Sequence, residues 1–130
     1  MRRTLLFALL SPALLVAQPG PHPIRPHAEL KIGTGVEKME IQGEAAEFKV
    51  AAGSRVFVWA KVMGAADTTV TFVFTKGDKT SKQELKVPRS PYRTFAYRTF
   101  RKGDEGEWTV KLMGDQAAEL GVATFKVEVQ

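Results

Sequence analysis

The sequence predicts an all-β fold for residues 28–130, an immunoglobulin-like antiparallel β-sandwich of about seven or eight strands. Apolar and polar residues alternate with a period of two in several short runs, as they do in strands with one buried face. Turn-forming residues separate these runs at intervals of roughly eight to twelve positions. No segment shows the spacing of apolar residues expected of a helix for more than one turn, with residues 115–120 as the single candidate exception. Together these observations favour two packed sheets, with a closed barrel as the alternative.

Several runs in the second half of the domain alternate almost perfectly. In the first of them, Val70, Phe72 and Phe74 share one face, while Thr71 and Thr75 share the other. Because successive side chains of a strand point to opposite faces, each such run predicts a strand with one buried side. The predicted strands are residues 70–75, 107–113 and 123–129, with a weaker one at 82–87.

The segments between these runs have the composition of turns. Gly77 can adopt a positive φ, so residues 75–79 are expected to form a hairpin turn. Pro88 and Pro91 have no backbone N–H to donate, and they mark a connection that cannot lie within a central strand. We interpret residues 115–120 as the loop of the hairpin that joins the last two strands.

One predicted strand, residues 55–62, is apolar on both faces, with Phe57 and Trp59 on the side opposite the smaller residues. Such a strand is either covered by protein on both sides or offers an aromatic patch to a partner. Both interpretations stay open for Trp59. Trp108, by contrast, is interpreted as one of the large buried residues that a sandwich needs.

The first 27 residues are expected to precede the folded domain. Arg2 and Arg3 are followed by an apolar run and by the small residue Ala17, which is the pattern of a secretory signal peptide at residues 1–17. The run is shorter than the roughly 20 residues that span a bilayer. We therefore predict a secreted or periplasmic protein with no membrane span after cleavage. Residues 18–27 contain four prolines and predict an extended, disordered tether.

The residue types present exclude several classes of site. The chain has no cysteine, and residues 28–130 contain no histidine, so a thiol nucleophile and a Ser-His-Asp triad are excluded. Asp104, Glu105 and Glu107 could in principle support glycoside hydrolysis, but they cluster in one predicted turn and are interpreted as a solvated acidic loop. Because no phosphate-binding glycine loop is present either, we predict a non-enzyme without cofactor or metal.

Charge is distributed unevenly along the chain. The formal net charge of +5 falls to +3 once Arg2 and Arg3 leave with the predicted signal peptide. Residues 76–102 are strongly basic, and residues 103–130 are acidic. This distribution fits two oppositely charged, solvated surfaces, or else a basic face for an anionic partner outside the cell.

The basic segment contains the tetrapeptide YRTF twice, at residues 92–95 and 97–100. The repeat has a period of five, which is odd, so a regular strand would point its two copies to opposite faces. Only a β-bulge near Ala96 would bring the copies into phase. Interleaved aromatic rings and arginines can bind ligands by stacking and charge, which makes Arg93, Tyr97 and Arg98 candidate binding residues together with Trp59.

A set of short motifs lies in a characteristic order between residues 30 and 129: Gly33-Thr34-Gly35-Val36-Glu37, Gly43-Glu44-Ala45, Val58-Trp59, Val62-Met63-Gly64-Ala65, Arg93-Thr94 and Gly106-Glu107-Trp108-Thr109-Val110. In this order they resemble the bacterial family called domain of unknown function 2914. The resemblance implies an exported or membrane-attached β-sandwich domain and no known activity. Phe72 and Phe74 depart from the family, whose members tend to carry a polar residue or His and then Trp there.

These observations predict a non-catalytic, exported interaction module of the bacterial cell envelope, whose partner is an envelope protein or polysaccharide. The alternative is a carbohydrate-binding module that uses exposed aromatic and arginine residues. Nucleic acid is not expected as a partner, because the chain carries an export signal and only a modest positive charge. The sequence leaves the oligomeric state open.

Overall fold

The computed structural model of this protein describes residues 25–130. The predicted signal peptide and the predicted tether up to residue 24 lie outside the described residues. The all-β prediction is confirmed, and the first strand begins at His27, one residue before the predicted start of the domain. The elements are β1 (His27–Gly33), β2 (Gly35–Glu37), β3 (Glu40–Gln42), β4 (Glu47–Val50), β5 (Ser54–Met63), β6 (Thr68–Lys76), β7 (Lys79–Val87), β8 (Tyr92–Phe100), β9 (Gly106–Met113), the 3-10 turn η1 (Asp115–Ala117) and β10 (Glu119–Val129).

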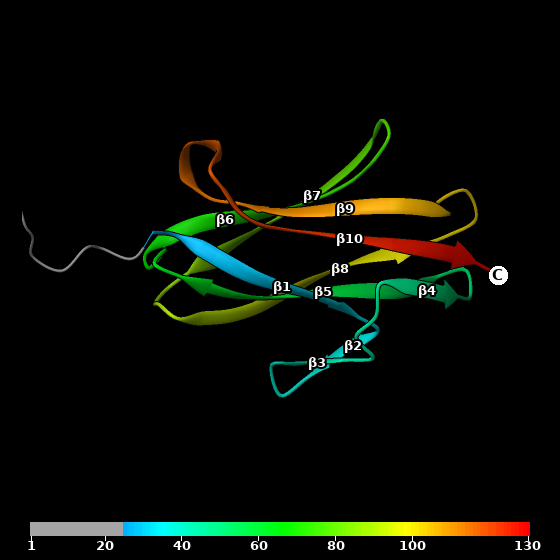
Figure 1. Ribbon diagram of the computed structural model, residues 1–130, viewed down its shortest axis with the longest axis horizontal. Helices are drawn as coiled ribbons and strands as arrows, with labels where there is room; N and C mark the ends of the chain where they lie inside the picture. Colours follow the sequence, from blue (N-terminus) through cyan, green and yellow to red (C-terminus); the bar gives the residue numbers. More distant parts are fainter. Residues whose placement is uncertain (1–24) are drawn as a thin grey trace, which may run out of the picture.

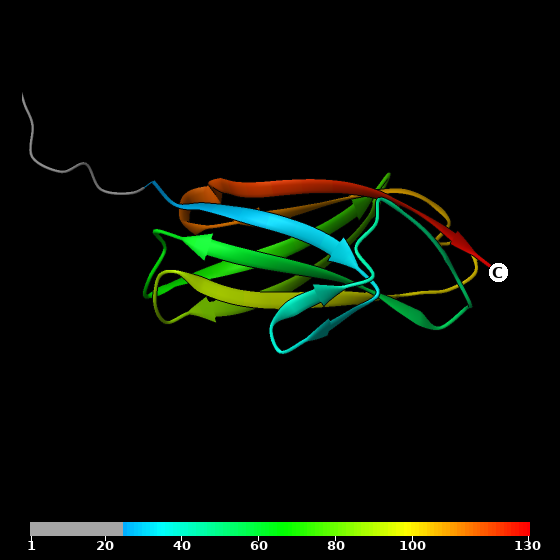
Figure 2. The same ribbon diagram turned by 60° about the horizontal axis from the view of Figure 1, so that its bottom comes forward.

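Two sheets of unequal width face each other (Figure 1). The three-stranded sheet has the order β1-β5-β8, and the five-stranded sheet has the order β4-β10-β9-β6-β7. A small hairpin, β2–β3, projects from the three-stranded side, and Figure 2 presents it in front of that sheet. Neighbouring strands are antiparallel as predicted, with the exception of β4, which pairs parallel to β10.

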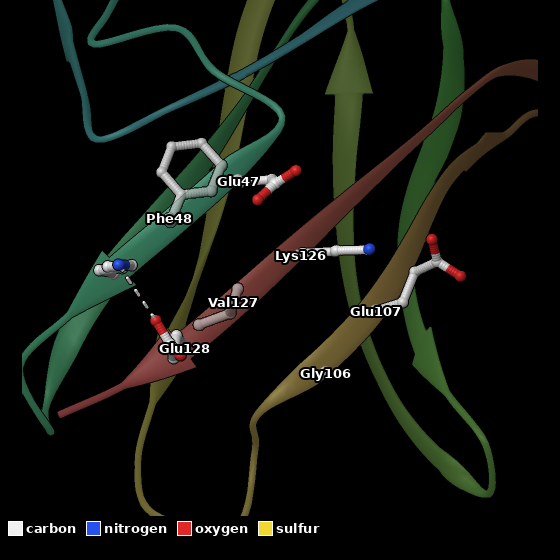
Figure 3. A pocket seen from close by; sticks show the side chains of 8 residues that line it. Glu47, Phe48, Gly106, Glu107, Lys126, Val127 and Glu128 are labelled. Atoms are coloured by element: carbon white, nitrogen blue, oxygen red, sulfur yellow. Dashed lines mark ion pairs between the residues drawn. The ribbon is translucent and has the colours of Figure 1, made fainter.

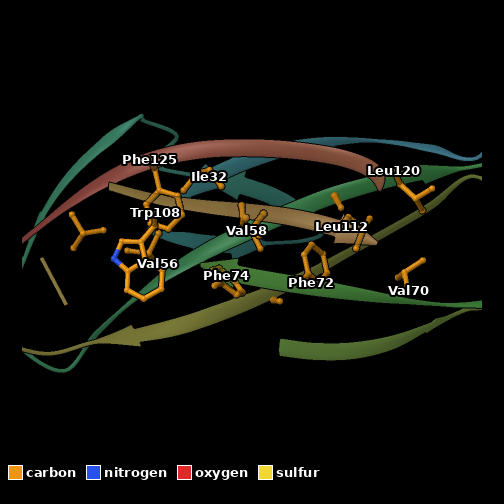
Figure 4. Packing of buried hydrophobic residues seen from close by; sticks show 14 of the residues in the cluster. Ile32, Val56, Val58, Val70, Phe72, Phe74, Trp108, Leu112, Leu120 and Phe125 are labelled. Carbon is orange, nitrogen blue, oxygen red and sulfur yellow. The ribbon is translucent and has the colours of Figure 1, made fainter. Parts of the chain in front are cut away.

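The core lies between the two sheets and consists of residues that the alternation predicted (Figure 4). Phe72 and Phe74 of β6 are at most 1% exposed, and Trp108 of β9 is fully buried. Phe100 of β8 packs edge-to-face against Trp108 and Phe125, with ring centroids 5.4 and 6.0 Å apart. This arrangement joins the two sheets by aromatic contacts that add to the free energy of burial.

The connections largely follow the prediction. Gly77 has a φ of 57° and lies in the tight turn between β6 and β7, as expected. Pro88 and Pro91 lie in the link between β7 and β8, outside the strands. The predicted loop at 115–120 contains the 3-10 turn η1 and leads into β10, so it does join the last two strands.

The strand β8 has no bulge. It pairs with β5 in regular register along its whole length, with Ala96 opposite Val58. Because side chains alternate between faces, the two copies of the YRTF repeat point in opposite directions. Arg98 lies on the core side of the sheet, whereas Arg93 lies on the outer side. The bulge that would bring the two copies into phase is therefore absent.

The loop that follows β8 is held by Asp104. Its carboxylate accepts hydrogen bonds from the Arg101 N–H and the Lys79 ammonium, each at 3.0 Å, and from the Arg98 guanidinium at 3.3 Å. The Trp108 indole N–H donates to the Asp104 carbonyl at 2.8 Å. The interpretation of this loop as a solvated acidic turn is wrong for Asp104, because only 15% of its side chain is exposed.

These contacts change the ionisation of Asp104. Burial raises the pKa of its carboxyl, but the hydrogen bonds from the Arg101 N–H, Lys79 and Arg98 outweigh burial and lower the pKa from 3.8 to about 2. Since the pKa is lower in the folded state than in the unfolded state, the ionised carboxylate stabilises the fold above pH 3.8. That contribution is lost as the pH falls toward 2.

We expect Asp104→Asn to lower the free energy of unfolding by about 1–3 kcal/mol at pH 7, because Arg98 loses its counter-charge. The difference from the wild type should shrink as the pH falls from 3.8 toward 2, where the wild-type carboxylate is protonated. Urea unfolding followed by Trp fluorescence measures it. Asp78→Asn, at the exposed β6–β7 turn, is the matched control. A difference that stays constant with pH would contradict this role.

Candidate functional site

The outer face of the three-stranded sheet breaks the alternation that the rest of the fold obeys. At outward positions of β5 and β8, where polar residues are expected, lie Phe57, Trp59, Phe95 and Tyr97. Trp59 lies opposite Phe95, and Phe57 lies opposite Tyr97. The Phe57 ring centroid is 5.5 Å from that of Tyr97 and 6.2 Å from that of Phe95. We call these four residues the outer aromatic face.

Cationic side chains surround the outer aromatic face. The Lys31 Nζ lies 5.3 Å from the Trp59 ring centroid, and the Arg55 Cζ lies 4.4 Å from that of Tyr97. Both distances are within the range of cation–π interactions, which also tolerate partial exposure. Lys61 and Arg93 lie directly opposite each other on β5 and β8. We call these cations the basic rim: Lys31, Arg55, Lys61 and Arg93.

The β2–β3 hairpin covers one part of the outer aromatic face. The Trp59 indole N–H donates a hydrogen bond of 2.7 Å to the Met39 carbonyl, and the Trp59 residue is only 4% exposed. The Arg93 guanidinium forms an ion pair with Glu40 of the same hairpin. The sequence left the position of Trp59 open, and the structure buries it. Its ring therefore offers no open face on which a ligand could stack.

The hairpin reaches this position through two local features. Lys38 and Met39 have φ values of 50° and 59°, so both central residues of its turn occupy the left-handed region without being glycine. Such conformations cost free energy and are often found at functional positions. At the other end, a Cβ on Gly33 would lie 2.3 Å from the Gln42 carbonyl oxygen, so glycine permits the close approach of β1 and β3.

The uncovered part of the outer face centres on Tyr97, which is 40% exposed. A groove of about 620 Å³ lies nearer the start of β8, beside the turn of the hairpin, and Tyr97 does not line it. Lys61, Arg89 and Arg93 contribute cationic groups to it, and the Arg89 Cζ lies 5.1 Å from the ring centroid of Tyr92. Three cations against two acids, Glu40 paired with Arg93 and Glu29 opposite Lys61, leave the groove with an excess of positive charge, which suits an anionic group.

Of the predicted binding residues, the structure brings Trp59, Arg93 and Tyr97 together on one face and separates Arg98 from them. The Arg98 guanidinium stacks 4.2 Å from the Trp108 ring centroid on the core side and pairs with Asp104. Arg98 therefore lies apart from the other three candidate binding residues, and its role as a binding residue stays a prediction. The odd period of the repeat is the physical reason for this separation.

Sequence reasoning missed the cations that the other strands contribute. Lys31, Arg55 and Lys61 join the site only because the register places them beside the rings of β5 and β8. Arg89 joins it from the β7–β8 link. The alternation of side chains in residues 55–62 could have revealed Arg55 and Lys61. Every second side chain of a strand lies on the same face, so both residues share a face with Phe57 and Trp59.

A second groove, of about 600 Å³, lies over β4, β9 and β10 (Figure 3). There Lys126 lies between Glu47 and Glu107 in the strand register, so charges of opposite sign alternate across the strands. Lys49 and Glu128 form an ion pair of 3.8 Å beside them. The lining of this groove carries three glutamates, two lysines and no exposed ring, which is typical of a solvated sheet face.

Residues 25–130 contain no group of three or more His, Asp or Glu side chains that could hold a metal ion. In the same part of the chain, no helix has the length and apolar character that a membrane crossing requires.

Comparison with known proteins places the chain as follows. Residues 67–127 match the model of a family described as a protein of unknown function, DUF2914, which confirms the predicted resemblance over those residues. This match includes β8 with Arg93 and Tyr97, whereas Trp59 and the β2–β3 hairpin precede it. No curated protein matches the sequence.

Among solved structures, the chain is similar to an immunoglobulin-like protein from Pseudomonas aeruginosa. The two share 16% sequence identity with a TM-score of 0.61, over 83% of this chain and 100% of that chain. This likeness confirms the immunoglobulin-like fold, and it bears on the fold alone.

We expect Trp59→Phe to loosen the β2–β3 hairpin selectively, because the substitution keeps an apolar ring but removes the N–H that binds the Met39 carbonyl. The loss of one hydrogen bond should cost about 0.5–1.5 kcal/mol. Hydrogen exchange followed by mass spectrometry should show faster exchange in residues 35–42 and unchanged exchange in β9. Equal acceleration in both segments would mean that Trp59 stabilises the whole domain rather than the hairpin.

Proposed function

We propose that this protein is a non-catalytic, exported interaction module of the bacterial cell envelope, and that it binds an anionic partner through the outer aromatic face and the basic rim. The single observation that supports this proposal most directly is the presence of aromatic rings at outward positions of β5 and β8. A sheet that only faces solvent carries polar residues there. Of the four rings, Tyr97 is exposed and Phe57 and Phe95 are partly exposed. Exposed apolar surface that is gathered at one place is a recognised sign of an interaction site.

The composition of this surface fits the binding of a macromolecule. Tyrosine, tryptophan, phenylalanine and arginine are enriched in interfaces, where their large side chains combine apolar area with hydrogen bonding or charge. Tyr97 and Arg55 supply both properties in one contact of 4.4 Å. Because Phe57 packs against both Tyr97 and Phe95, the partner would meet a largely preformed surface.

The sign of the charge supports an anionic partner. Within the described strands β1, β5 and β8, Glu29 is the only acid at an outward position, against the four cations of the basic rim. Lys61 and Arg93 lie opposite each other, and like charges in such a pair destabilise a sheet. Glu29, which lies opposite Lys61 on β1, and Glu40, which pairs with Arg93, offset part of this repulsion, and a bound acidic group would offset more of it. Export rests on the predicted signal peptide at residues 1–17.

The alternative, a carbohydrate-binding module, has weaker physical support. Stacking on sugar rings needs an aromatic side chain with an open face, and Trp59 is covered by the hairpin. Tyr97 is the ring with substantial exposure on this side, and Arg55 already lies over it. We therefore propose a protein partner and treat a polysaccharide as an outcome of the test.

The test replaces Tyr97 with a benzophenone-bearing amino acid and irradiates envelope fractions of cells that produce the variant. We expect a defined covalent adduct, because Tyr97 lies at the centre of the exposed part of the surface. Val122 on β10 is the matched control position, since it is exposed to 51% but belongs to the other sheet. Combining the Tyr97 crosslinker with Arg55→Glu should reduce the adduct roughly tenfold if the cation contributes about 1.4 kcal/mol.

Identical adducts from the Tyr97 and Val122 positions, or none from either, would contradict the proposed surface. The chemical nature of the adduct separates the two candidate functions. After proteolysis, a second peptide joined to the fragment that contains position 97 supports the protein partner. A carbohydrate joined to that fragment, which polysaccharide-cleaving enzymes remove, would replace the proposal with the carbohydrate alternative.

A further inference from the structure

The strand β8 is an edge of its sheet. Its nine residues pair with β5 on one side, and among the described residues no strand pairs with its other side. An edge strand presents a row of backbone N–H and C=O groups to which a further strand can add. The opposite sheet is wider and continues from β6 to β7 on the same side of the sandwich.

In constant-type immunoglobulin domains, a further strand pairs with the strand that corresponds to β8. A constant-type immunoglobulin domain has the strands A, B, E and D in one sheet and C, F and G in the other. By chain order and pairing, β1, β5 and β8 correspond to A, B and E, while β6, β9 and β10 correspond to C, F and G. Strand D would lie next to β8, but β7, the strand at its position in chain order, pairs with β6 in the opposite sheet. Between residues 25 and 130 no strand occupies that place.

Burial on β7 provides an independent sign of this vacancy. Ser81, Gln83 and Leu85 have the same parity as the buried residues of β6, with Leu85 opposite Val70 in the register. They are nevertheless only half-buried, whereas Val70 is completely buried. The inner side chains of β7 are therefore only partly covered by the opposite sheet, and a strand added beside β8 would cover them further.

We propose that β8 accepts an extended, acidic segment of a partner protein as an added β-strand in the strand-D position. This inference rests on the proposed function and specifies how the partner binds. Backbone hydrogen bonds along β8 supply sequence-independent affinity, and the side chains at alternate positions supply selectivity.

Charge determines which segment fits. Residues 88–103 contain no Asp or Glu, and their cations are Arg89, Arg93, Arg98, Arg101 and Lys102. Arg98 pairs with Asp104 and Arg93 pairs with Glu40, but the side chain of Arg93 is still 48% exposed and lines the groove with Lys61 and Arg89. An acidic side chain beside the start of β8 would enter this groove. The acidic side chains of the added strand would all lie on the outer face, because Arg93, Phe95 and Tyr97 share that face. The alternating side chains between them would point to the core side, beside Ala96 and toward the half-buried side of β7, where β-branched residues such as valine fit.

A second copy of β8 is a rival occupant. In an antiparallel register centred on Ala96, Arg93 would lie opposite Thr99 and Phe95 opposite Tyr97, so the repeat could pair with itself. Self-pairing would, however, bring two cation-rich segments without acids side by side. Electrostatic complementarity therefore favours an acidic partner.

The test uses a fluorescent nine-residue peptide of alternating glutamate and valine, matched in length to β8. We expect it to bind the purified protein and to protect the backbone amides of β8 from hydrogen exchange. The critical control is the same peptide with N-methyl groups on alternate amides. It keeps every side chain but cannot form one row of ladder hydrogen bonds, and it should bind at least roughly tenfold more weakly.

Two variants localise the binding. Arg93→Glu should weaken binding of the glutamate–valine peptide at least roughly tenfold. Lys82→Glu makes the same change in net charge at an exposed position opposite Val73, on the outer side of the other sheet, and should leave binding unchanged. Both substitutions lie on strand surfaces, and circular dichroism of each variant checks that the fold is retained.

The results distinguish the proposed interaction surface from the more specific proposal that a strand adds to β8. Equal binding of the methylated and unmethylated peptides would overturn strand addition while leaving the proposed interaction surface intact. No binding of either peptide would overturn the acidic-strand proposal, and the Tyr97 crosslinking experiment then decides the proposed function by itself. A concentration-dependent dimer in sedimentation velocity that Thr99→Arg dissociates would overturn the proposal in favour of a second copy.

Discussion

The constraint on which the rest of the structure depends is that β5 is apolar on both faces. Its inner side chains, such as Val56 and Val58, are completely buried between the sheets. Its outer side chains, Phe57 and Trp59, also have to leave water, because exposed aromatic area is costly. The β2–β3 hairpin covers Trp59, while Phe57 packs against its neighbours on β8. The hairpin, the left-handed turn in it and the partly open aromatic surface all follow from this second apolar face.

The YRTF repeat illustrates how one strand can serve both sides of a sheet. An odd period sends Arg98 inward, where stacking on Trp108 and pairing with Asp104 hold the loop after β8. The same period sends Arg93 outward, where it pairs with Glu40 and lines the groove. Two arginines in identical local sequence therefore have different roles, one in stability and one in the proposed recognition. Both arginines belong to the same strand, β8, five residues apart.

Period-two alternation made most of the long strands predictable, because a single buried face marks residues such as Phe72 and Trp108 directly in the sequence. The β2–β3 hairpin was not predictable in this way, since its strands have only three residues each and its turn at Lys38 and Met39 contains no glycine. The parallel pairing of β4 depends on a long-range contact that no local pattern encodes. The basic rim likewise forms only because the strand register brings its four cations together. The sequence therefore predicted that aromatic and cationic residues form the site, but not which residues of other strands belong to it.

The pairing of β10 also has a consequence for the order of folding. Residues 119–129 pair with β9 on one side and with β4 on the other, and they contact β1 as well. Lys126, for example, is the register partner of Glu47, far earlier in the chain. Contacts between such distant segments carry a large loop-closure entropy and slow the search for the native state. The five-stranded sheet therefore cannot be completed until residues 119–129 have been synthesised, because β4 reaches the rest of that sheet only through β10.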